Sequence, residues 1–110
     1  MNQDAGKKGE DKATKYLEGQ GNIILARNFR VRAGEIDIIA TNDQEIIFAE
    51  VKLRKSRIFG GAISALPTKR IERLRNAALV YLSEHENKDK QVKLILLAIQ
   101  GDEISEIVLD

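Results

Sequence analysis

Acidic side chains interrupt two segments of this 110-residue sequence that otherwise have the composition of buried strands. Asp37 lies within GEIDIIA and Glu50 within EIIFAEVKL, where Lys52 follows two residues later. Ile, Val and Phe favour strands, whereas charged residues are rarely buried in a protein interior unless they are paired. Carboxylates at such positions can bind a divalent cation, provided that the fold brings them together.

The two segments predict a hairpin that turns at Asp43-Gln44 and places Asp37 opposite Glu50. Because side chains alternate along a strand, one face of this hairpin is then apolar. That face consists of Ile36, Ile38, Ala40, Ile47, Ala49 and Val51. Asp37 and Glu50 share the other face, where their repulsion must be offset by water, by Lys52 or a neighbouring Arg, or by a divalent cation. Mg²⁺ is commonly held by one or two carboxylates together with substrate phosphates.

The N-terminal segment contributes a third carboxylate. Residues 4–19 predict a helix whose inward stripe contains Gly6, Gly9, Glu10, Ala13, Tyr16 and Leu17. The two small residues allow this helix to approach the sheet, which leaves Glu10 at the interface, where an unpaired carboxylate is unfavourable. Glu10 could instead lie at the margin of the stripe and meet solvent or Lys7. Convergence of Glu10, Asp37 and Glu50 around Lys52 is the alternative that predicts a functional site.

The remaining segments predict a single α/β domain over residues 1–110. Further strands are expected at 22–31, 91–100 and 103–109, beside those at 34–40 and 45–53, and a second helix at about 67–86. The order αβββαββ predicts a central mixed β-sheet flanked by helices.

Positive charge is concentrated in residues 52–75, which carry eight Lys or Arg and one Glu and so sum to +7. The segments before and after this block sum to −2 and −4. Such a block suits a polyanion, although a solvated loop and helix face would explain it equally well. The candidate phosphate-binding residues are Arg54, Lys55, Arg57, Lys69, Arg70 and Arg73.

Composition excludes several other kinds of site. The sequence has no Cys, which rules out disulfides, a thiolate nucleophile and a Cys-ligated metal. It has no apolar run long enough to span a bilayer, and the segment MNQDAGKKGEDKATKYL lacks the apolar core of a signal peptide. We therefore expect a cytoplasmic protein with no membrane partner.

Together, Glu10, Asp37 in GEID, and Glu50 and Lys52 in EVK resemble the signature of the PD-(D/E)xK nuclease superfamily, which includes restriction endonucleases and archaeal Holliday-junction resolvases. More closely, the segments GEDKATKYLEGQGNIILARNFRVRAGEIDIIA and FAEVKLRKSRIFGGAISALPTKRIERLRNAALVYL resemble the YraN-type family of small predicted nucleases. The similarity covers about residues 6–82. It implies a restriction-endonuclease-like fold and a metal-dependent endonuclease that hydrolyses phosphodiester bonds of DNA, including branched or junction DNA.

The resemblance also implies roles for individual residues. Asp37 and Glu50 would be direct ligands of Mg²⁺ or Mn²⁺, with the Val51 carbonyl as a third ligand, and Glu10 would contact a second metal ion or its water shell. Lys52 would orient the attacking water or stabilise the phosphate charge. The residue-based alternative for Lys52 is a plain counter-charge for its cross-strand neighbour Glu35.

Two further expectations rest on the resemblance. Lys69 matches a helix position that faces the site in the family, whereas Ile95 stands where family members often carry Asp, so no role is assigned to the C-terminal strands. By analogy with junction resolvases, which cut at two symmetric positions, we expect a homodimer. The rival functions are a non-catalytic nucleic-acid-binding module on the same fold, and a protein whose acidic cluster binds a structural metal.

Overall fold

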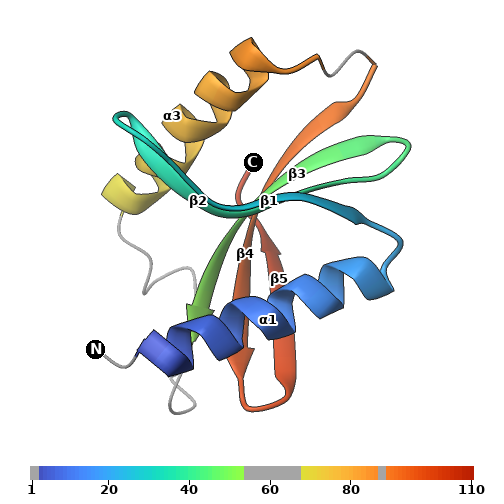
Figure 1. Ribbon diagram of the computed structural model, residues 1–110, viewed down its shortest axis with the longest axis vertical. Helices are drawn as coiled ribbons and strands as arrows, with labels where there is room; N and C mark the ends of the chain where they lie inside the picture. The colour runs from blue at the N-terminus through green and yellow to red at the C-terminus, as the bar shows by residue number, and fades with distance from the viewer. Residues whose placement is uncertain (1–2, 54–67, 87–88) are drawn as a thin grey trace.

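The chain folds as a five-stranded mixed sheet with one helix packed on each face (Figure 1). The computed structural model describes residues 3–53, 68–86 and 89–110. In chain order the elements are α1 (Gln3–Gly19), β1 (Ile23–Val31), β2 (Gly34–Thr41), β3 (Glu45–Leu53), α3 (Thr68–Glu84), β4 (Gln91–Gln100) and β5 (Glu103–Val108). The predicted αβββαββ order and the α/β class with a central mixed sheet are confirmed.

The strands lie side by side in the order β1-β2-β3-β4-β5. β3 and β4 are parallel and are connected through α3, whereas the other neighbours are antiparallel. In the β2–β3 hairpin, Ile38 pairs with Ala49 and Ile39 with Phe48, which is the predicted register. The fold therefore brings the acidic ends of β2 and β3 to the same edge of the hairpin, far from its turn.

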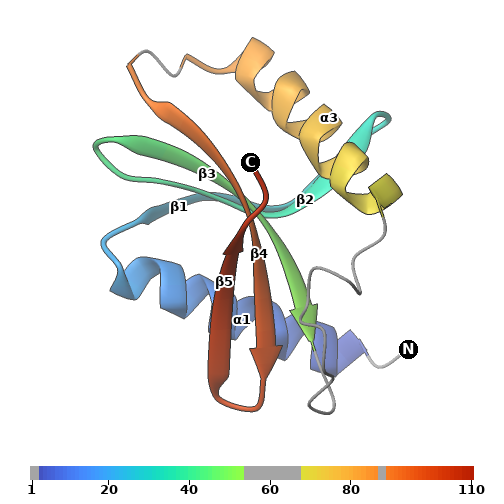
Figure 2. The same cartoon turned by 180° about the vertical axis from the view of Figure 1, so that it is seen from behind.

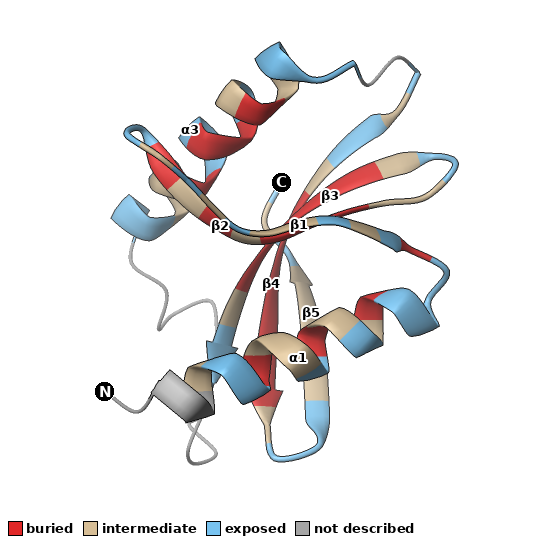
Figure 3. Ribbon diagram, viewed as in Figure 1, coloured by how far each residue is buried: buried red, intermediate tan, exposed pale blue. Residues whose placement is uncertain are grey.

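Each face of the sheet has its own apolar core (Figures 2 and 3). On one face, Ala13 and Leu17 of α1 pack against the sheet, and both are fully buried. On the other face, Leu74 and Tyr81 of α3 pack against Phe48, whose ring meets that of Tyr81 edge to face at 5.8 Å. The stripe predicted for the helix at residues 4–19 thus forms one of the two interfaces.

The predicted alternation fails at Ile36, which was expected to share a face with Ile38. Ile36 packs in the core under α3, whereas Ile38 packs in the core under α1. The neighbouring strand explains the change, because Asn28 has a left-handed backbone conformation (φ 54°) that non-Gly residues seldom adopt. Phe29, the partner of Ile36, also packs under α3. The end of the β1–β2 hairpin therefore turns towards α3.

Gly34 allows this hairpin to lie against α3. An added Cβ at Gly34 would overlap the main-chain carbonyl oxygen of Arg73, so the two backbones are in direct contact. Gly9 has a related role on α1, since a Cβ there would lie 3.0 Å from the side chain of Leu53. The predicted close approach of α1 to the sheet is thus confirmed at Gly9.

The two described helices each have 17 residues and a polar outer face. Neither combines the length and the apolar character needed to cross a membrane.

Replacing Gly34 by Ala should lower the free energy of unfolding by roughly 1–3 kcal/mol, because the helix or the hairpin must move to make room for the added methyl group. Urea denaturation of the two proteins would measure the difference. Gly6→Ala is the matched control, since a Cβ at this helical position meets nothing within 4 Å and should stabilise the protein by roughly 0.5–1 kcal/mol. Equal stability of Gly34→Ala and the parent chain would show that this contact is not tight.

Candidate active site

The carboxylates predicted to converge lie in one cleft. It has a volume of about 560 Å³ and is bordered by the first half of α1 and the acidic ends of β2 and β3. Its lining includes Glu10, Asn28, Arg30, Glu35, Asp37, Glu50, Val51, Lys52 and Arg70. The four residues predicted to form the catalytic set, Glu10, Asp37, Glu50 and Lys52, are thus neighbours in space although 42 positions separate the first from the last.

Glu50 is the most buried carboxylate of the cleft, with 2% of the residue exposed. It lies in the middle of the sheet, where β3 is paired with the parallel strand β4. Its Oε2 accepts hydrogen bonds from two nitrogens of Arg70, Nε at 2.7 Å and Nη2 at 2.5 Å. The same guanidinium reaches Glu35, whose Oε1 lies 3.6 Å from Nη1. Arg70 therefore links two acidic side chains to the first turn of α3.

Burial raises the pKa of Glu50 from its ordinary value of 4.5 to about 7. The negative charge of Asp37 contributes in the same direction, and the guanidinium of Arg70 opposes it. Burial also raises the pKa of Asp37, while the hydrogen bond from the Val51 amide lowers it and the charge of Glu10 raises it. Acids whose ionisation is weakened by burial and by a neighbouring negative charge are a common feature of functional sites.

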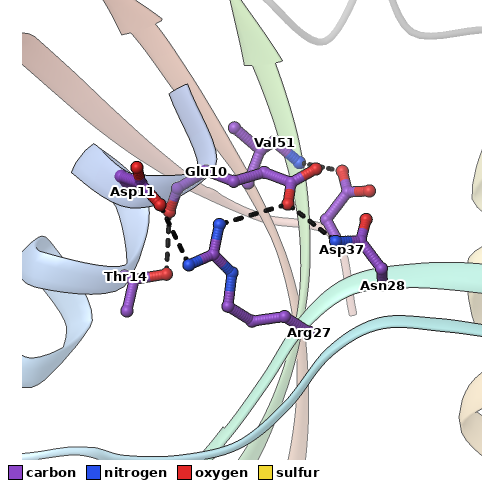
Figure 4. Close-up of polar contacts among 7 residues, drawn as sticks. All are labelled: Glu10, Asp11, Thr14, Arg27, Asn28, Asp37 and Val51. Carbon is purple, nitrogen blue, oxygen red and sulfur yellow. Dashed lines mark hydrogen bonds and ion pairs between the residues drawn. The ribbon is translucent and has the colours of Figure 1, made fainter. Parts of the chain in front are cut away.

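The side chain of Asp37 accepts a hydrogen bond from a main-chain amide of β3, where the regular pairing of β2 and β3 has ended. The paired part of the β2–β3 hairpin extends to Ile38 and Ala49, and beyond it the Val51 amide donates to Oδ2 of Asp37 at 2.7 Å (Figure 4). Because the amide and carbonyl of one strand residue point to the same side, the Val51 carbonyl also faces the β2 side. This orientation is compatible with the ligand role that the resemblance implies for Val51.

Glu10 is held by β1 rather than by solvent or Lys7. Its Oε1 accepts a hydrogen bond from Nδ2 of Asn28 at 3.0 Å and lies 3.4 Å from Nη2 of Arg27 (Figure 4). The other nitrogen of Arg27 binds Asp11 at 3.0 Å. The left-handed conformation of Asn28 allows two consecutive residues of β1 to reach the same carboxylate.

A shared pattern emerges from these contacts, in that each carboxylate is held through one oxygen. The oxygens are Oε1 of Glu10, Oδ2 of Asp37 and Oε2 of Glu50. Within the described ranges, no hydrogen bond or ion pair reaches the second oxygen of any of them. Donors that hold one oxygen orient the other, as is usual around metal ligands.

These donors suit a hard cation. Residues 3–53, 68–86 and 89–110 contain no group of three Asp, Glu or His side chains that would form a metal centre on its own. A cation in the cleft would therefore rest on two carboxylates with main-chain and substrate oxygens, which is the arrangement that Mg²⁺ favours. Asp37 and Glu50, together with the Val51 carbonyl, are the residues that fit it.

Lys52 lies two residues after Glu50 on β3 and is exposed at the rim of the cleft. Glu35, the residue that Lys52 was alternatively expected to neutralise, lies 3.6 Å from Nη1 of Arg70. Ile95, at the position where family members often carry Asp, is fully buried in the core under α1. At residue 95, β4 thus contributes an apolar side chain to the core and no carboxylate to the cleft.

The predicted phosphate-binding residues fall into three groups. Lys69 is exposed and Arg73 is partly exposed, so both remain candidates. Arg70 is engaged with Glu50 and Glu35, which corresponds to the predicted alternative that a neighbouring Arg offsets the acidic charge. Arg54, Lys55 and Arg57 lie outside the described residues.

Sequence reasoning also missed Arg27 and Asn28 as partners of Glu10. A signal was present in the segment ARNFR, which places three polar residues in a predicted strand. Asn is among the few residues that tolerate the left-handed conformation, so it is the natural candidate for a break in that strand. The identity of the partner on α1 was not accessible from spacing.

Comparison with known proteins gives one consistent result. The model of the uncharacterised protein family UPF0102 matches residues 9–99. A UPF0102 protein of Shewanella loihica is 44% identical over 99 residues, which cover 90% of this chain and 86% of the relative. UPF0102 proteins of Persephonella marina and Neisseria meningitidis are 39% and 37% identical, over 93% and 92% of this chain and 88% of each relative. These names state no activity.

The burial of Glu50 predicts a specific dependence of stability on pH. The unfolded chain loses this proton near pH 4.5, whereas the folded chain keeps it until about pH 7. The folded state binds more protons in this range, so the contribution of Glu50 to stability is lost as pH rises. Glu50→Gln removes the titration, and its free energy of unfolding relative to the parent should therefore rise between these pH values, by roughly 3 kcal/mol.

Urea denaturation at a series of pH values, in the presence of a chelator, would measure this difference. Arg70→Gln should shift the upper end of the range to higher pH, because the guanidinium favours the ionised carboxylate. A difference between Glu50→Gln and the parent that does not vary with pH would contradict the raised pKa.

Proposed function

We propose that this chain, which belongs to the uncharacterised protein family UPF0102, is a metal-dependent endonuclease that hydrolyses phosphodiester bonds of DNA. The observation that carries the proposal is the position of the buried Glu50 beside Asp37 and below the exposed Lys52 in one cleft. A purely structural role would not require a carboxylate to be buried at the centre of a sheet. The arrangement matches the residue types of the nuclease signature that the sequence resembles.

The metal would be held by Asp37 and Glu50 with the Val51 carbonyl, and Glu10 would contact a second ion or its water shell. A divalent cation such as Mg²⁺ or Mn²⁺ supplies positive charge to a phosphate and lowers the pKa of water. The second oxygens of the acidic side chains would be the donors, because the first oxygens are already occupied by protein groups.

The chain's own residues would perform the remaining tasks. Arg70 opposes the rise in the pKa of Glu50 and so favours the ionised form that a cation requires. Asn28 and Arg27 hold Glu10 across from Asp37. Lys52 would place its ammonium group at the mouth of the cleft, where it could orient the attacking water or stabilise charge on the phosphate.

A second function, a non-catalytic nucleic-acid-binding module, is favoured by one observation. Arg70 already supplies a positive charge to Glu50 without any metal, as it would in a protein that uses the site only for structure. The two functions differ in one requirement. In the nuclease, Glu50 must bind a cation and give up part of its contact with Arg70, whereas in the binding module this contact can remain intact. Cleavage assays and metal titrations distinguish them.

The direct test is incubation of the purified chain with a panel of linear, flapped and four-way-junction DNAs in the presence of Mg²⁺ or Mn²⁺. The nuclease proposal expects metal-dependent cleavage of at least one of these DNAs and none with chelator. DNA binding without cleavage of any of them would favour the binding module, and neither binding nor cleavage would contradict both.

Within the site, the variants Glu50→Ala and Lys52→Met should distinguish the residue that binds the metal from the residue that acts in cleavage. Glu50→Ala should weaken Mn²⁺ binding and abolish cleavage together. Lys52→Met keeps a stem of similar length, so Mn²⁺ should bind at least as tightly as in the parent while cleavage is lost. Calorimetry with Mn²⁺ alongside cleavage assays would measure both properties. Lys15→Met, on the exposed surface of α1, is the control that removes a charge elsewhere.

Two results would contradict these roles. Wild-type cleavage by Lys52→Met would remove the most specific residue of the signature from the mechanism. Unchanged Mn²⁺ binding by Glu50→Ala would place the metal elsewhere.

For junction DNA we propose a homodimer, because two symmetric cuts require two cleavage sites. Sedimentation with and without a four-way junction would measure the assembly. A monomer under both conditions would exclude the two-fold resolvase version and leave a nuclease that cuts one strand.

A further inference from the structure

The β1–β2 hairpin carries a local excess of positive charge that the net charge of residues 1–51 conceals. Residues 19–34 contain Arg27, Arg30 and Arg32 and no Asp or Glu. Arg27 is engaged with acidic residues of α1. Arg30 and Arg32 are both exposed, the first lining the cleft and the second in the turn of the hairpin.

Arg30 does not form the ion pair that its place in the hairpin would favour. In the register of the hairpin it lies directly opposite Glu35, and opposite charges at such positions usually pair. Glu35 instead contacts Arg70 from α3. In the described part of the chain, no acidic side chain forms an ion pair with Arg30 or Arg32.

The hairpin and α3 form a continuous surface. The backbone contact between Gly34 and Arg73 fixes the turn of the hairpin against the first half of the helix (Figures 1 and 2). Lys69 lies one helical turn before Arg73 and is exposed. Exposed positive residues thus lie on two elements whose backbones touch, and one of them, Arg30, lines the cleft.

We propose that the β1–β2 hairpin is a DNA-binding element in which Arg30 and Arg32 contact backbone phosphates, and that Lys69 and Arg73 continue the same contact along α3. The inference rests on the proposed function, since the phosphate next to Arg30 is the one that would enter the cleft. It extends the binding surface beyond the basic block of residues 52–75 to a strand and turn earlier in the chain. Arginine suits this task because its planar guanidinium matches the geometry of a phosphate.

Arginines on the outermost strand have another explanation. β1 lies at one edge of the sheet, and charged side chains on an edge strand discourage pairing with other chains. This explanation predicts that removing the two charges promotes self-association and leaves DNA affinity unchanged. The proposal instead predicts weaker DNA binding and no change in self-association.

The experiment measures the affinity of the full chain for a fluorescent DNA duplex at several salt concentrations, in chelator so that no cleavage occurs. For the parent, the logarithm of the binding constant should fall linearly with the logarithm of the salt concentration, by about 0.9 per phosphate contact. The double variant Arg30→Gln/Arg32→Gln should bind more weakly, and its slope should be smaller by about two. Arg30→Lys/Arg32→Lys should restore the slope of the parent, because the charges are restored.

Lys15→Gln is the matched control, since it removes one exposed charge on α1 and should leave the slope unchanged. A parent that binds DNA while the Arg30→Gln/Arg32→Gln variant keeps its slope would overturn this inference and leave the nuclease proposal standing. The opposite combination of results is also possible. A smaller salt dependence of DNA binding in this variant, together with no cleavage by the parent in Mg²⁺ or Mn²⁺, would support the hairpin as a DNA contact and contradict the nuclease proposal. A parent that binds no duplex at low salt would overturn the inference.

Discussion

The burial of the Glu50 carboxylate is the constraint on which the arrangement of the site depends. A charged group at the centre of a sheet is unfavourable unless it is paired and hydrogen-bonded. Here Arg70 provides both kinds of interaction, and it does so from the first turn of α3. The beginning of that helix is therefore tied to the middle of the sheet by a polar contact, while its later turns are held by the apolar contacts of Leu74 and Tyr81. A polar contact therefore holds the first turn of α3, and apolar contacts hold the turns that follow.

The second acidic residue depends on a departure from regular structure. If β1 and β2 alternated regularly to their ends, Ile36 would lie with Ile38 under α1 rather than beneath α3. The left-handed Asn28 allows the hairpin to turn at that point, which buries Ile36 under α3 and directs Asp37 into the cleft with Glu10. Backbone strain of this kind is frequent at functional sites and persists where surrounding contacts determine it. The contact between Gly34 and α3 is one such determinant.

Much of this arrangement could be predicted from the sequence, because it follows from periodicity. The period of two in the β2 and β3 segments indicates their register, and the stripe of small and apolar residues indicates which side of α1 faces the sheet. The convergence of Glu10, Asp37 and Glu50 in one cleft was one of two predicted alternatives, but the bend at Asn28 that brings Asp37 towards Glu10 could not be predicted from periodicity. Periodicity could not predict the partners of these acids. Whether Arg70 binds a phosphate or Glu50 depends on the distance between a helix and a strand that are separated by about 20 positions, and no local pattern encodes it.

Under the proposed function, an acidic cleft must accept an anionic substrate. A cleft with four acidic side chains repels phosphate, so the proposed nuclease would need positive charge close by. The structure supplies such charge in two forms. Arg70 and Arg27 are engaged with the acids and reduce the local negative potential. Arg30, Arg32 and Lys69 are exposed, and Arg30 lines the cleft. Because interactions between exposed charges are weakened by salt far more than those of buried pairs, the two forms should differ in salt sensitivity. DNA affinity would then vary strongly with ionic strength while the geometry of the acidic cleft would not. Under the proposed function, the same separation would allow a divalent cation to compete with Arg70 for Glu50 without weakening the surface proposed to bind DNA.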